Sequence, residues 1–281
     1  SLSLDLRVQH AMYEQLADAL TRYQAIAASG VMLDIRTGEV VGMVSLPDYD
    51  PNDPGSINDE YRGLKNQRFN RITSGIYELG STMKTVTMAA ALDSGKVRLS
   101  DQFDARFGVR FGRFTIDDFH GKHRLLSVPE IYKYSSNIGT IKVMQALGKD
   151  EFRAFMSKIG FDKGVQFELP EMREPKIPEK FSEIVAATAS FGHGISISPL
   201  HMAQAYAGFV NDGVMIPVTL MKRSEEDAAK LGKRIISSET SVEIRSLMRL
   251  NALEGSGTRM NMYANGYRVG GKTGTAEKVV K

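Results

Sequence analysis

The chain has 281 residues, of which 42% are hydrophobic and 25% are charged, an ordinary composition for a globular protein of one large domain or two small ones. The net charge of +3 is too small to indicate a nucleic-acid or membrane surface by itself. No run approaches the roughly 18 apolar residues of a membrane span, and the absence of cysteine excludes disulfides and thiolate chemistry.

The first third of the chain begins with an amphipathic helix and a hairpin. Apolar residues of the helix recur at helical spacing, at Val8, Met12, Leu16 and Leu20. Residues 30–35 and 39–44 are predicted strands joined by a tight turn, and they form a hairpin at the opening of a sheet. Residues 47–70 are rich in Pro, Asp, Asn and Gly, which indicates a loop. A buried, alanine-rich helix is predicted from near Ser81 to residues 93–95.

Residues 101–124 interleave phenylalanines with arginines and lysines, a pattern found on RNA-binding faces. Four aspartates offset much of that charge and no RNP-type strand is present. We therefore expect short strands and turns packed on aromatic side chains, and no nucleic-acid partner. A helix is predicted over residues 128–147, with Ser127 and Glu130 as a capping box.

The remaining chain alternates helices with connections. Helices are predicted over residues 151–159, 183–191, 199–210 and 238–253. Residues 161–181 are an expected surface connection, 214–220 a strand, 255–267 a flexible stretch, and the residues around Lys272 a strand. The five histidines have no metal-ligand spacing, and no P-loop is present, so neither a metal nor a cofactor is expected.

A serine and a lysine stand three residues apart where the buried helix begins. Positions i and i+3 share a helix face, so the hydroxyl of Ser81 and the ammonium of Lys84 can meet. A buried lysine loses its proton more easily than in water, and can then take the serine proton and make that oxygen a nucleophile. Taken alone, the more ordinary interpretation is a helix cap at Ser81 with a solvated Lys84.

Two further short motifs follow in order, Ser135-Ser136-Asn137 and Lys272-Thr273-Gly274. The chain contains no other S-x-x-K and no other K-[ST]-G. Together the three motifs resemble the set typical of class A β-lactamases and penicillin-binding proteins, in which the middle motif is S-D-N. The three motifs occur in the expected order, and each lies in a plausible helix or strand. Both observations favour nucleophilic catalysis over the helix-cap interpretation of Ser81.

Each motif residue has a chemical reason to be present. Ser81 attacks a carbonyl carbon, with Lys84 as the proton acceptor. Ser135 passes a proton to the departing amine, and Asn137 holds Lys84 and a substrate amide together. Lys272 supplies positive charge that keeps Lys84 deprotonated and attracts a carboxylate.

The last motif is also expected to bind substrate. Thr273 and Thr275 offer hydroxyls to the substrate carboxylate. Gly274 lacks a side chain, so a substrate backbone can lie along the strand. The backbone N–H groups of Ser81 and Thr275 are the expected oxyanion donors.

With these motifs and their flanks, the chain resembles the transpeptidase domain of class B penicillin-binding proteins, and among them the cell-division enzymes. The resemblance runs almost end to end through residues 2–9, 37–52, 77–84, 134–139, 190–206 and 271–276. Two positions depart from the usual pattern: Leu79 stands where proline is usual, and His193 where glutamine is commoner.

The resemblance implies a single domain over residues 1–281 in the α/β (α+β) class. Its fold would be the penicillin-binding transpeptidase and serine β-lactamase fold, mainly an antiparallel sheet flanked by helices, with an all-helical subdomain. It also implies a D,D-transpeptidase. Ser81 would be acylated by a peptidoglycan stem peptide ending in D-Ala-D-Ala, and a neighbouring stem amine would take the acyl group during septal wall synthesis. β-Lactam antibiotics would acylate Ser81 durably.

Family members carry a membrane anchor and a pedestal domain before this region, and further strands and a helix after it. We therefore expect a domain truncated at both ends, whose Lys272 strand lacks a partner and whose acylation is weakened. The full-length protein would lie on the periplasmic face of the bacterial inner membrane and bind divisome proteins.

Two alternatives have the same fold. A β-lactamase needs a base for deacylation, which class A enzymes take from an E-x-x-x-N segment, and none lies between Asn137 and Lys272. A β-lactam sensor would keep the acylation chemistry and differ in segments outside this sequence. The lifetime of a penicillin adduct separates the β-lactamase from the transpeptidase.

Overall fold

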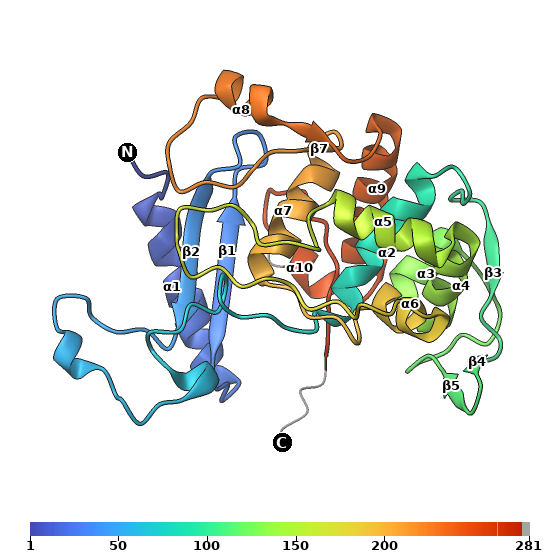
Figure 1. Ribbon diagram of the computed structural model, residues 1–281, viewed down its shortest axis with the longest axis horizontal. Coiled ribbons are helices and arrows are strands. Elements are labelled where there is room, and N and C mark those ends of the chain that lie inside the picture. Colours follow the sequence, from blue (N-terminus) through green and yellow to red (C-terminus); the bar gives the residue numbers. More distant parts are fainter. Residues whose placement is uncertain (263, 277–281) are drawn as a thin grey trace. The chain divides into compact units, whose positions relative to one another are not determined.

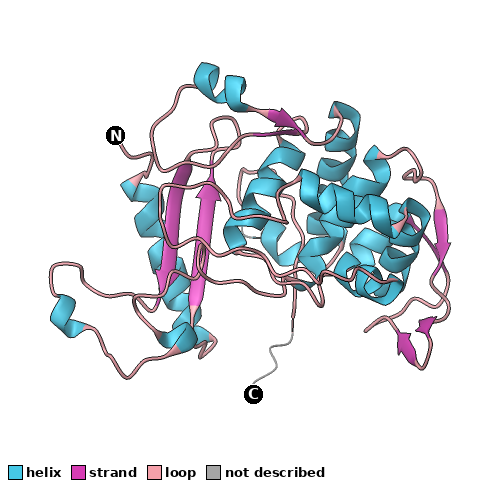
Figure 2. Cartoon of the chain, viewed as in Figure 1, coloured by secondary structure: helices cyan, strands magenta, loops and turns pink. Residues whose placement is uncertain are grey.

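The structure is a computed structural model that describes residues 1–262 and 264–276 (Figure 1). The chain divides into two compact units built from interleaved stretches. Unit 1 comprises Ser1–Tyr77, Gly160–Pro175 and Ile197–Lys233, and unit 2 comprises Glu78–Ile159, Lys176–Ser196 and the described residues from Arg234 onward. Helices and antiparallel strand pairs both occur, in agreement with the predicted class (Figure 2).

Unit 1 contains the predicted N-terminal helix and hairpin. Its elements are α1 (Leu6–Arg22), β1 (Ala28–Leu33), β2 (Val40–Leu46), α7 (Pro199–Val210), β7 (Val214–Met215) and α8 (Glu225–Leu231), and β8 (Lys233–Arg234) lies at its boundary. β1 and β2 pair antiparallel, with a register shift between Met32 and Leu33. The side chain of Asp5 caps α1 by accepting a hydrogen bond from the backbone of Arg7.

The two faces of the hairpin pack on different helices. On one face Gly42 lets α1 approach closely, because a Cβ there would lie 2.7 Å from the sulfur of Met12. On the other face Val31 and Leu33 pack in an apolar cluster that contains Leu200 of α7. Successive side chains of a strand point to opposite faces of the sheet. The hairpin therefore packs against α1 on one face and α7 on the other.

The predicted strand over residues 214–220 is wrong beyond Met215. Pro217 lies in the middle of the segment and has no N–H to donate to a ladder. Beyond Met215 the segment forms only isolated backbone contacts among the described residues: Val40 donates to the carbonyl of Thr219, Thr219 donates to that of Gly38, and Ser3 donates to that of Leu220. The predicted loop over residues 47–70 is confirmed, with two short 3-10 turns at Pro54–Ser56 and Gly63–Lys65.

Unit 2 is mainly helical. Its elements are the 3-10 turn Gly80–Thr82, α2 (Met83–Asp93), β3 (Gln102–Asp104), β4 (Val109–Phe111), β5 (Phe114–Ile116), β6 (Leu125–Ser127), α3 (Val128–Tyr134), α4 (Asn137–Leu147), α5 (Lys149–Lys158), α6 (Glu183–Ser190), α9 (Ser238–Glu254) and α10 (Thr258–Met262). Every residue of α2 from Met83 to Leu92 is buried. A helix that is apolar all round must be covered on all sides, and α4, α5, α6 and α9 pack against α2.

Short strands form within residues 101–124, as expected, and β6 follows directly after them. β3 pairs antiparallel with β6, and β4 with β5. The expected packing of the aromatic residues is wrong for three of them: Phe107, Phe114 and Phe119 are 76%, 56% and 91% exposed.

Two predictions in unit 2 fail for reasons that bear on the site. The single helix over residues 128–147 is wrong because Ser135 adopts a left-handed conformation, with φ 57° and ψ 41°, which ends α3 before α4 begins. The strand at Lys272 is also wrong, because residues 270–276 form no ladder among the described residues. The backbone N–H of Gly271 donates instead to the carbonyl of Met248 in α9.

None of the described helices is both long and apolar enough to span a membrane. In the part of the chain that the structure describes, no group of three histidine, aspartate or glutamate side chains is placed to hold a metal ion.

Candidate active site

Ser81 lies in the 3-10 turn that leads into α2. Gly80 enters this turn with a φ of 54°, a left-handed conformation that favours glycine. The hydroxyl of Thr82 donates to the carbonyl of Leu79 at 2.8 Å and closes the turn. The predicted helix start is therefore confirmed, and Lys84 follows in the first turn of α2.

Lys84 is buried rather than solvated, so the helix-cap interpretation fails. Its ammonium donates to the carbonyl oxygen and, at 3.0 Å, to the hydroxyl of Ser135. Burial lowers the pKa of Lys84 well below its usual value, and the charge of Lys272 lowers it further, while Asp118 acts in the opposite direction. Lys84 is therefore neutral over a wider pH range than an exposed lysine, as a general base requires.

The hydroxyl of Ser135 joins the three motifs. It lies 3.0 Å from the ammonium of Lys84, 3.0 Å from the ammonium of Lys272 and 3.1 Å from the hydroxyl of Ser81. All four side chains belong to unit 2. The structure thus brings together the nucleophile, the base and the second lysine that the sequence motifs predicted.

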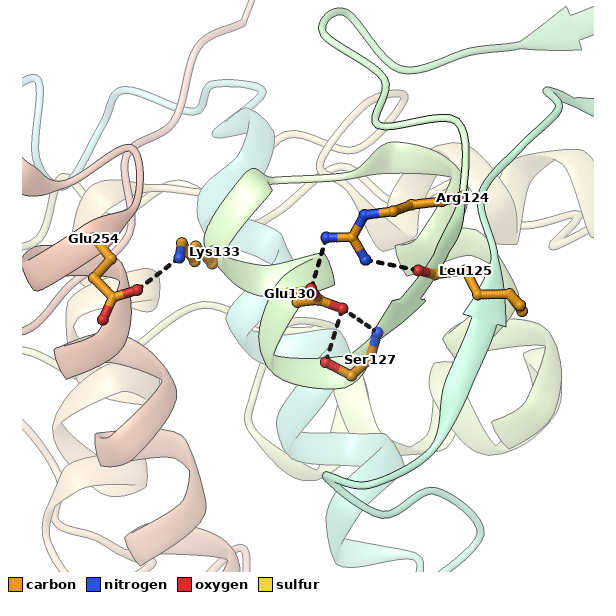
Figure 3. Close-up of polar contacts among 6 residues, drawn as sticks. All are labelled: Arg124, Leu125, Ser127, Glu130, Lys133 and Glu254. Atoms are coloured by element: carbon orange, nitrogen blue, oxygen red, sulfur yellow. Dashed lines mark hydrogen bonds and ion pairs between the residues drawn. The ribbon is translucent and has the colours of Figure 1, made fainter.

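Helix α3 carries Ser135 at its C-terminal end and is fixed at both ends (Figure 3). The predicted capping box is confirmed: the backbone N–H of Ser127 donates to the carboxylate of Glu130 at 3.0 Å. Arg124 donates to the same carboxylate at 2.7 Å, and these bonds lower the pKa of Glu130 to about 2. Near the other end, Lys133 pairs with Glu254 of α9 at 2.6 Å.

Asp118 is a site residue that sequence reasoning missed. Its carboxylate accepts hydrogen bonds from the hydroxyl of Ser136 at 2.7 Å and from the backbone N–H of Ile138 at 2.9 Å. It therefore caps α4 together with Ser136, whose hydroxyl accepts from Gly139. No sequence signal marks Asp118, because it stands 18 residues before Ser136 in an irregular segment.

Asn137 begins α4 directly after Ser135 and Ser136. The predicted bond between Asn137 and Lys84 is not present among the hydrogen bonds of the described residues, since those of the Lys84 ammonium go to Ser135. The side chain of Asn137 therefore stays a predicted substrate contact.

Lys272 is buried, with 8% of its surface exposed. Its ammonium donates to the hydroxyl of Ser135 and to the carbonyl of Thr273, each at 3.0 Å. Burial lowers the pKa of Lys272 to about 8, so the side chain is still largely charged at neutral pH. The positive charge that the sequence placed beside Lys84 is therefore present.

Three glycines allow backbone segments to meet beside Ser81. A Cβ on Gly80 would lie 2.2 Å from the carbonyl oxygen of Thr275, and one on Gly274 would lie 2.5 Å from that of Leu79. A Cβ on Gly192 would lie 2.1 Å from the carbonyl oxygen of Gly80. The backbone of Thr275 therefore lies against the turn that carries Ser81, as the predicted pair of oxyanion donors requires. The role of Gly192 was not predicted.

The substrate-binding residues predicted after Lys272 are all exposed, namely Thr273, Gly274 and Thr275. The hydroxyl of Thr273 is already engaged: it donates to the hydroxyl of Ser256 at 2.7 Å. The hydroxyl of Thr275 makes no hydrogen bond with the described residues.

Residues 28–281 match the protein family described as "Penicillin binding protein transpeptidase domain". The chain is 38% identical over 278 residues to the "Probable peptidoglycan D,D-transpeptidase FtsI" of Caulobacter vibrioides, and 30% identical over 282 residues to the "Peptidoglycan D,D-transpeptidase FtsI" of Escherichia coli. Each alignment covers 99% of this chain and 46% of the relative, so the chain spans about half the length of these relatives.

Solved structures show the same likeness. The transpeptidase domain of penicillin-binding protein 3 from Burkholderia pseudomallei superposes with a TM-score of 0.85 at 30% identity, over 99% of this chain and 78% of the other. A Burkholderia ambifaria structure described as a peptidoglycan glycosyltransferase gives a TM-score of 0.85 at 29% identity, over 99% and 82%. The predicted division-type resemblance agrees with these neighbours.

Proposed function

The chain belongs to the penicillin-binding protein transpeptidase family, and we propose on that premise that it is the catalytic domain of a serine-type peptidoglycan D,D-transpeptidase. The observation that carries the proposal is the hydroxyl of Ser135, which lies within 3.1 Å of Ser81 and both lysines. A nucleophile, a base of lowered pKa and a buried cation in one hydrogen-bonded cluster are the groups that acyl transfer needs.

In the acylation step, the oxygen of Ser81 attacks the carbonyl carbon of the penultimate D-Ala of a stem peptide. Ser135 lies between Ser81 and Lys84, and no direct bond joins those two among the described residues. When Lys84 is neutral, Ser135 donates its proton to Lys84 and accepts that of Ser81. The serine proton therefore reaches Lys84 through the hydroxyl of Ser135.

The negative charge that forms on the carbonyl oxygen is stabilised by the backbone N–H groups of Ser81 and Thr275. A donor of this kind typically contributes roughly 3 to 4 kcal/mol. The bond to the terminal D-Ala then breaks, and its amine leaves with the proton that Ser135 returns from Lys84. An ester between Ser81 and the stem peptide remains.

Substrate binding uses the other motif residues. Lys272 attracts the terminal carboxylate of the stem peptide, and Asn137 holds a substrate amide. Residues 273–275 lie beside the bound peptide, where the missing side chain of Gly274 leaves room for its backbone. An amine of a second stem peptide then attacks the ester, frees Ser81 and completes the cross-link.

We place this activity in septal wall synthesis, because two of the relatives are named FtsI and the chain resembles the division enzymes. We propose β-lactams as covalent inhibitors at Ser81, and divisome proteins as partners of the full-length, membrane-anchored protein. The family match over residues 28–281 supports one transpeptidase domain.

Intact-mass measurement after treatment with benzylpenicillin tests the proposal. We expect an adduct of one penicillin, mapped by peptide analysis to Ser81 and lasting many minutes, and none in Ser81→Ala. A stem peptide ending in D-Ala-D-Ala, given with an acceptor amine, should yield free D-Ala and the cross-linked product. An adduct on another residue would refute the proposed nucleophile, and an adduct lasting seconds would favour a β-lactamase.

A further inference from the structure

The second lysine of the site, Lys272, lies over the ring of a tyrosine that no sequence motif marks. Tyr132 of α3 is fully buried, and the ammonium of Lys272 lies 6.0 Å from the centre of its ring. We infer that Tyr132 is a positioning residue, whose ring supports the charged ammonium of Lys272 and whose hydroxyl ties α3 to α2. The inference rests on the proposed function for the role of Lys272 in acylation.

The ammonium of Lys272 has more donors than acceptors around it. It donates to the hydroxyl of Ser135 and to the carbonyl of Thr273, each at 3.0 Å, and makes no further hydrogen bond with the described residues. An ammonium carries a third N–H donor, and a buried donor without a partner is costly. The face of an aromatic ring carries partial negative charge and attracts a cation within about 6 Å of its centre. The ring of Tyr132 therefore supplies the attraction that a third acceptor would supply.

No carboxylate forms an ion pair with Lys272 in the part of the chain that the structure describes. On the elements around it, Lys84 of α2 is itself a cation when protonated, and Arg249 of α9 donates to a backbone carbonyl. The carboxylates are engaged elsewhere: Asp118 caps α4, and Glu254 of α9 pairs with a lysine of α3. None of these groups is a counter-ion for Lys272, so its charge depends on uncharged neighbours.

The hydroxyl of Tyr132 lies 2.7 Å from that of Thr85, the residue after Lys84 in α2. Both side chains are fully buried, and this hydrogen bond gives the phenol its partner. Burial raises the pKa of Tyr132 above its usual range, so the phenol stays neutral and attracts Lys272 through its ring rather than as an ion. The backbone carbonyl of Tyr132 also accepts from the N–H of Ser135 at 3.2 Å. Tyr132 therefore contacts all three stretches that carry the motifs.

A matched pair of ring substitutions tests the inference. Tyr132→Phe keeps the ring face and removes only the hydroxyl. Replacement of Tyr132 by trifluorophenylalanine keeps nearly the same shape and withdraws negative charge from the ring face. The rate of acylation by benzylpenicillin should fall with rising pH as Lys272 loses its proton. We expect this fall to lie lower in the trifluoro form than in Tyr132→Phe, by about half a pH unit or more, because a weaker attraction lets the ammonium lose its proton more easily.

A tyrosine that only fills the core would give a different result. Both forms would then slow acylation alike at every pH, and the two falls would coincide. That outcome would overturn the inference, and so would a fall at higher pH in the trifluoro form. Thr85→Val is the matched control, because it removes the partner of the hydroxyl and leaves the ring in place. It should lower the melting temperature, since the buried phenol loses its hydrogen bond, and leave the pH of the fall unchanged.

A second measurement needs no acylation. Lysine that is isotope-labelled at the carbon next to its amine reports the titration of each ammonium by NMR, and Lys272→Met identifies the signal of Lys272. The pKa of Lys272 should be lower in the trifluoro form than in Tyr132→Phe. Equal pKa values in the two forms would refute the role of the ring. Absence of acylation in the unsubstituted chain would refute the proposed function instead, and the titration would still decide the role of Tyr132.

Discussion

Lys84 lies on a helix that is buried all round, whereas Lys272 lies in a stretch without regular secondary structure. Residues 83–92 are held by apolar packing against four other helices. Residues 270–276 are held by directed hydrogen bonds, among them those from Gly271 to Met248 and from Asn251 to Gly271. Both lysines nevertheless donate to the same hydroxyl of Ser135.

This difference shows how two cations can be kept side by side. Burial alone lowers the pKa of each lysine, because an ammonium loses its hydration. The more deeply buried Lys84 is lowered further by the charge of Lys272, so one lysine can be neutral while the other stays charged. The packed helix thus carries the proposed base, and the hydrogen-bonded stretch carries the cation.

Removing the base should have the largest effect. Lys84→Met keeps a long, unbranched side chain in the buried site and removes the proton acceptor. We expect acylation to slow by roughly 10²- to 10⁴-fold. The melting temperature should not fall, because a buried polar group is replaced by an apolar one. Stopped-flow acylation and thermal unfolding check the two parts, with Lys158→Met, a substitution of a more exposed lysine, as the control.

A substitution that pushes the turn before α2 away from residues 270–276 should have the next largest effect. Gly80→Ala adds a Cβ that would lie 2.2 Å from the carbonyl oxygen of Thr275, so the oxyanion donors move apart. We expect acylation to slow by roughly 10²-fold.

Gly95→Ala is the matched control for Gly80→Ala, because Gly95 also has a positive φ, of 72°, and nothing lies within 4 Å of its added Cβ. Gly95→Ala therefore introduces the backbone strain of a positive φ without a steric clash. If the two variants slow acylation equally, strain and not displacement of Thr275 is the cause.

Weakening the support of Ser135 should have the smallest effect. Ser127→Ala removes the cap of α3 and should lower the free energy of unfolding by about 1 kcal/mol. Acylation should slow only a fewfold, because Asp118 and the pair of Lys133 with Glu254 remain. Urea unfolding measures the first effect. Ser224→Ala, which removes the cap of α8 in unit 1, should cost similar stability without slowing acylation.

The sequence predicted the parts of the site that are encoded locally. The start of the α2 helix, the capping box of α3 and each of the three motifs are made of residues that are neighbours in the chain. The left-handed Ser135 was not predictable, since non-glycine residues seldom adopt that conformation. Asp118, Gly192 and Asn251 reach the site only through tertiary folding, and no pattern within a single sequence indicates which distant residue a motif will contact.

The dependence of acylation on pH tests the central claim most directly, that a neutral Lys84 and a charged Lys272 act together. Lys84 is neutral only above its lowered pKa, and Lys272 is charged only below its pKa of about 8. The acylation rate with benzylpenicillin should therefore rise from low pH, pass through a maximum and fall near pH 8. A rate that keeps rising up to the usual pKa of an exposed lysine, about 10.4, would contradict the account.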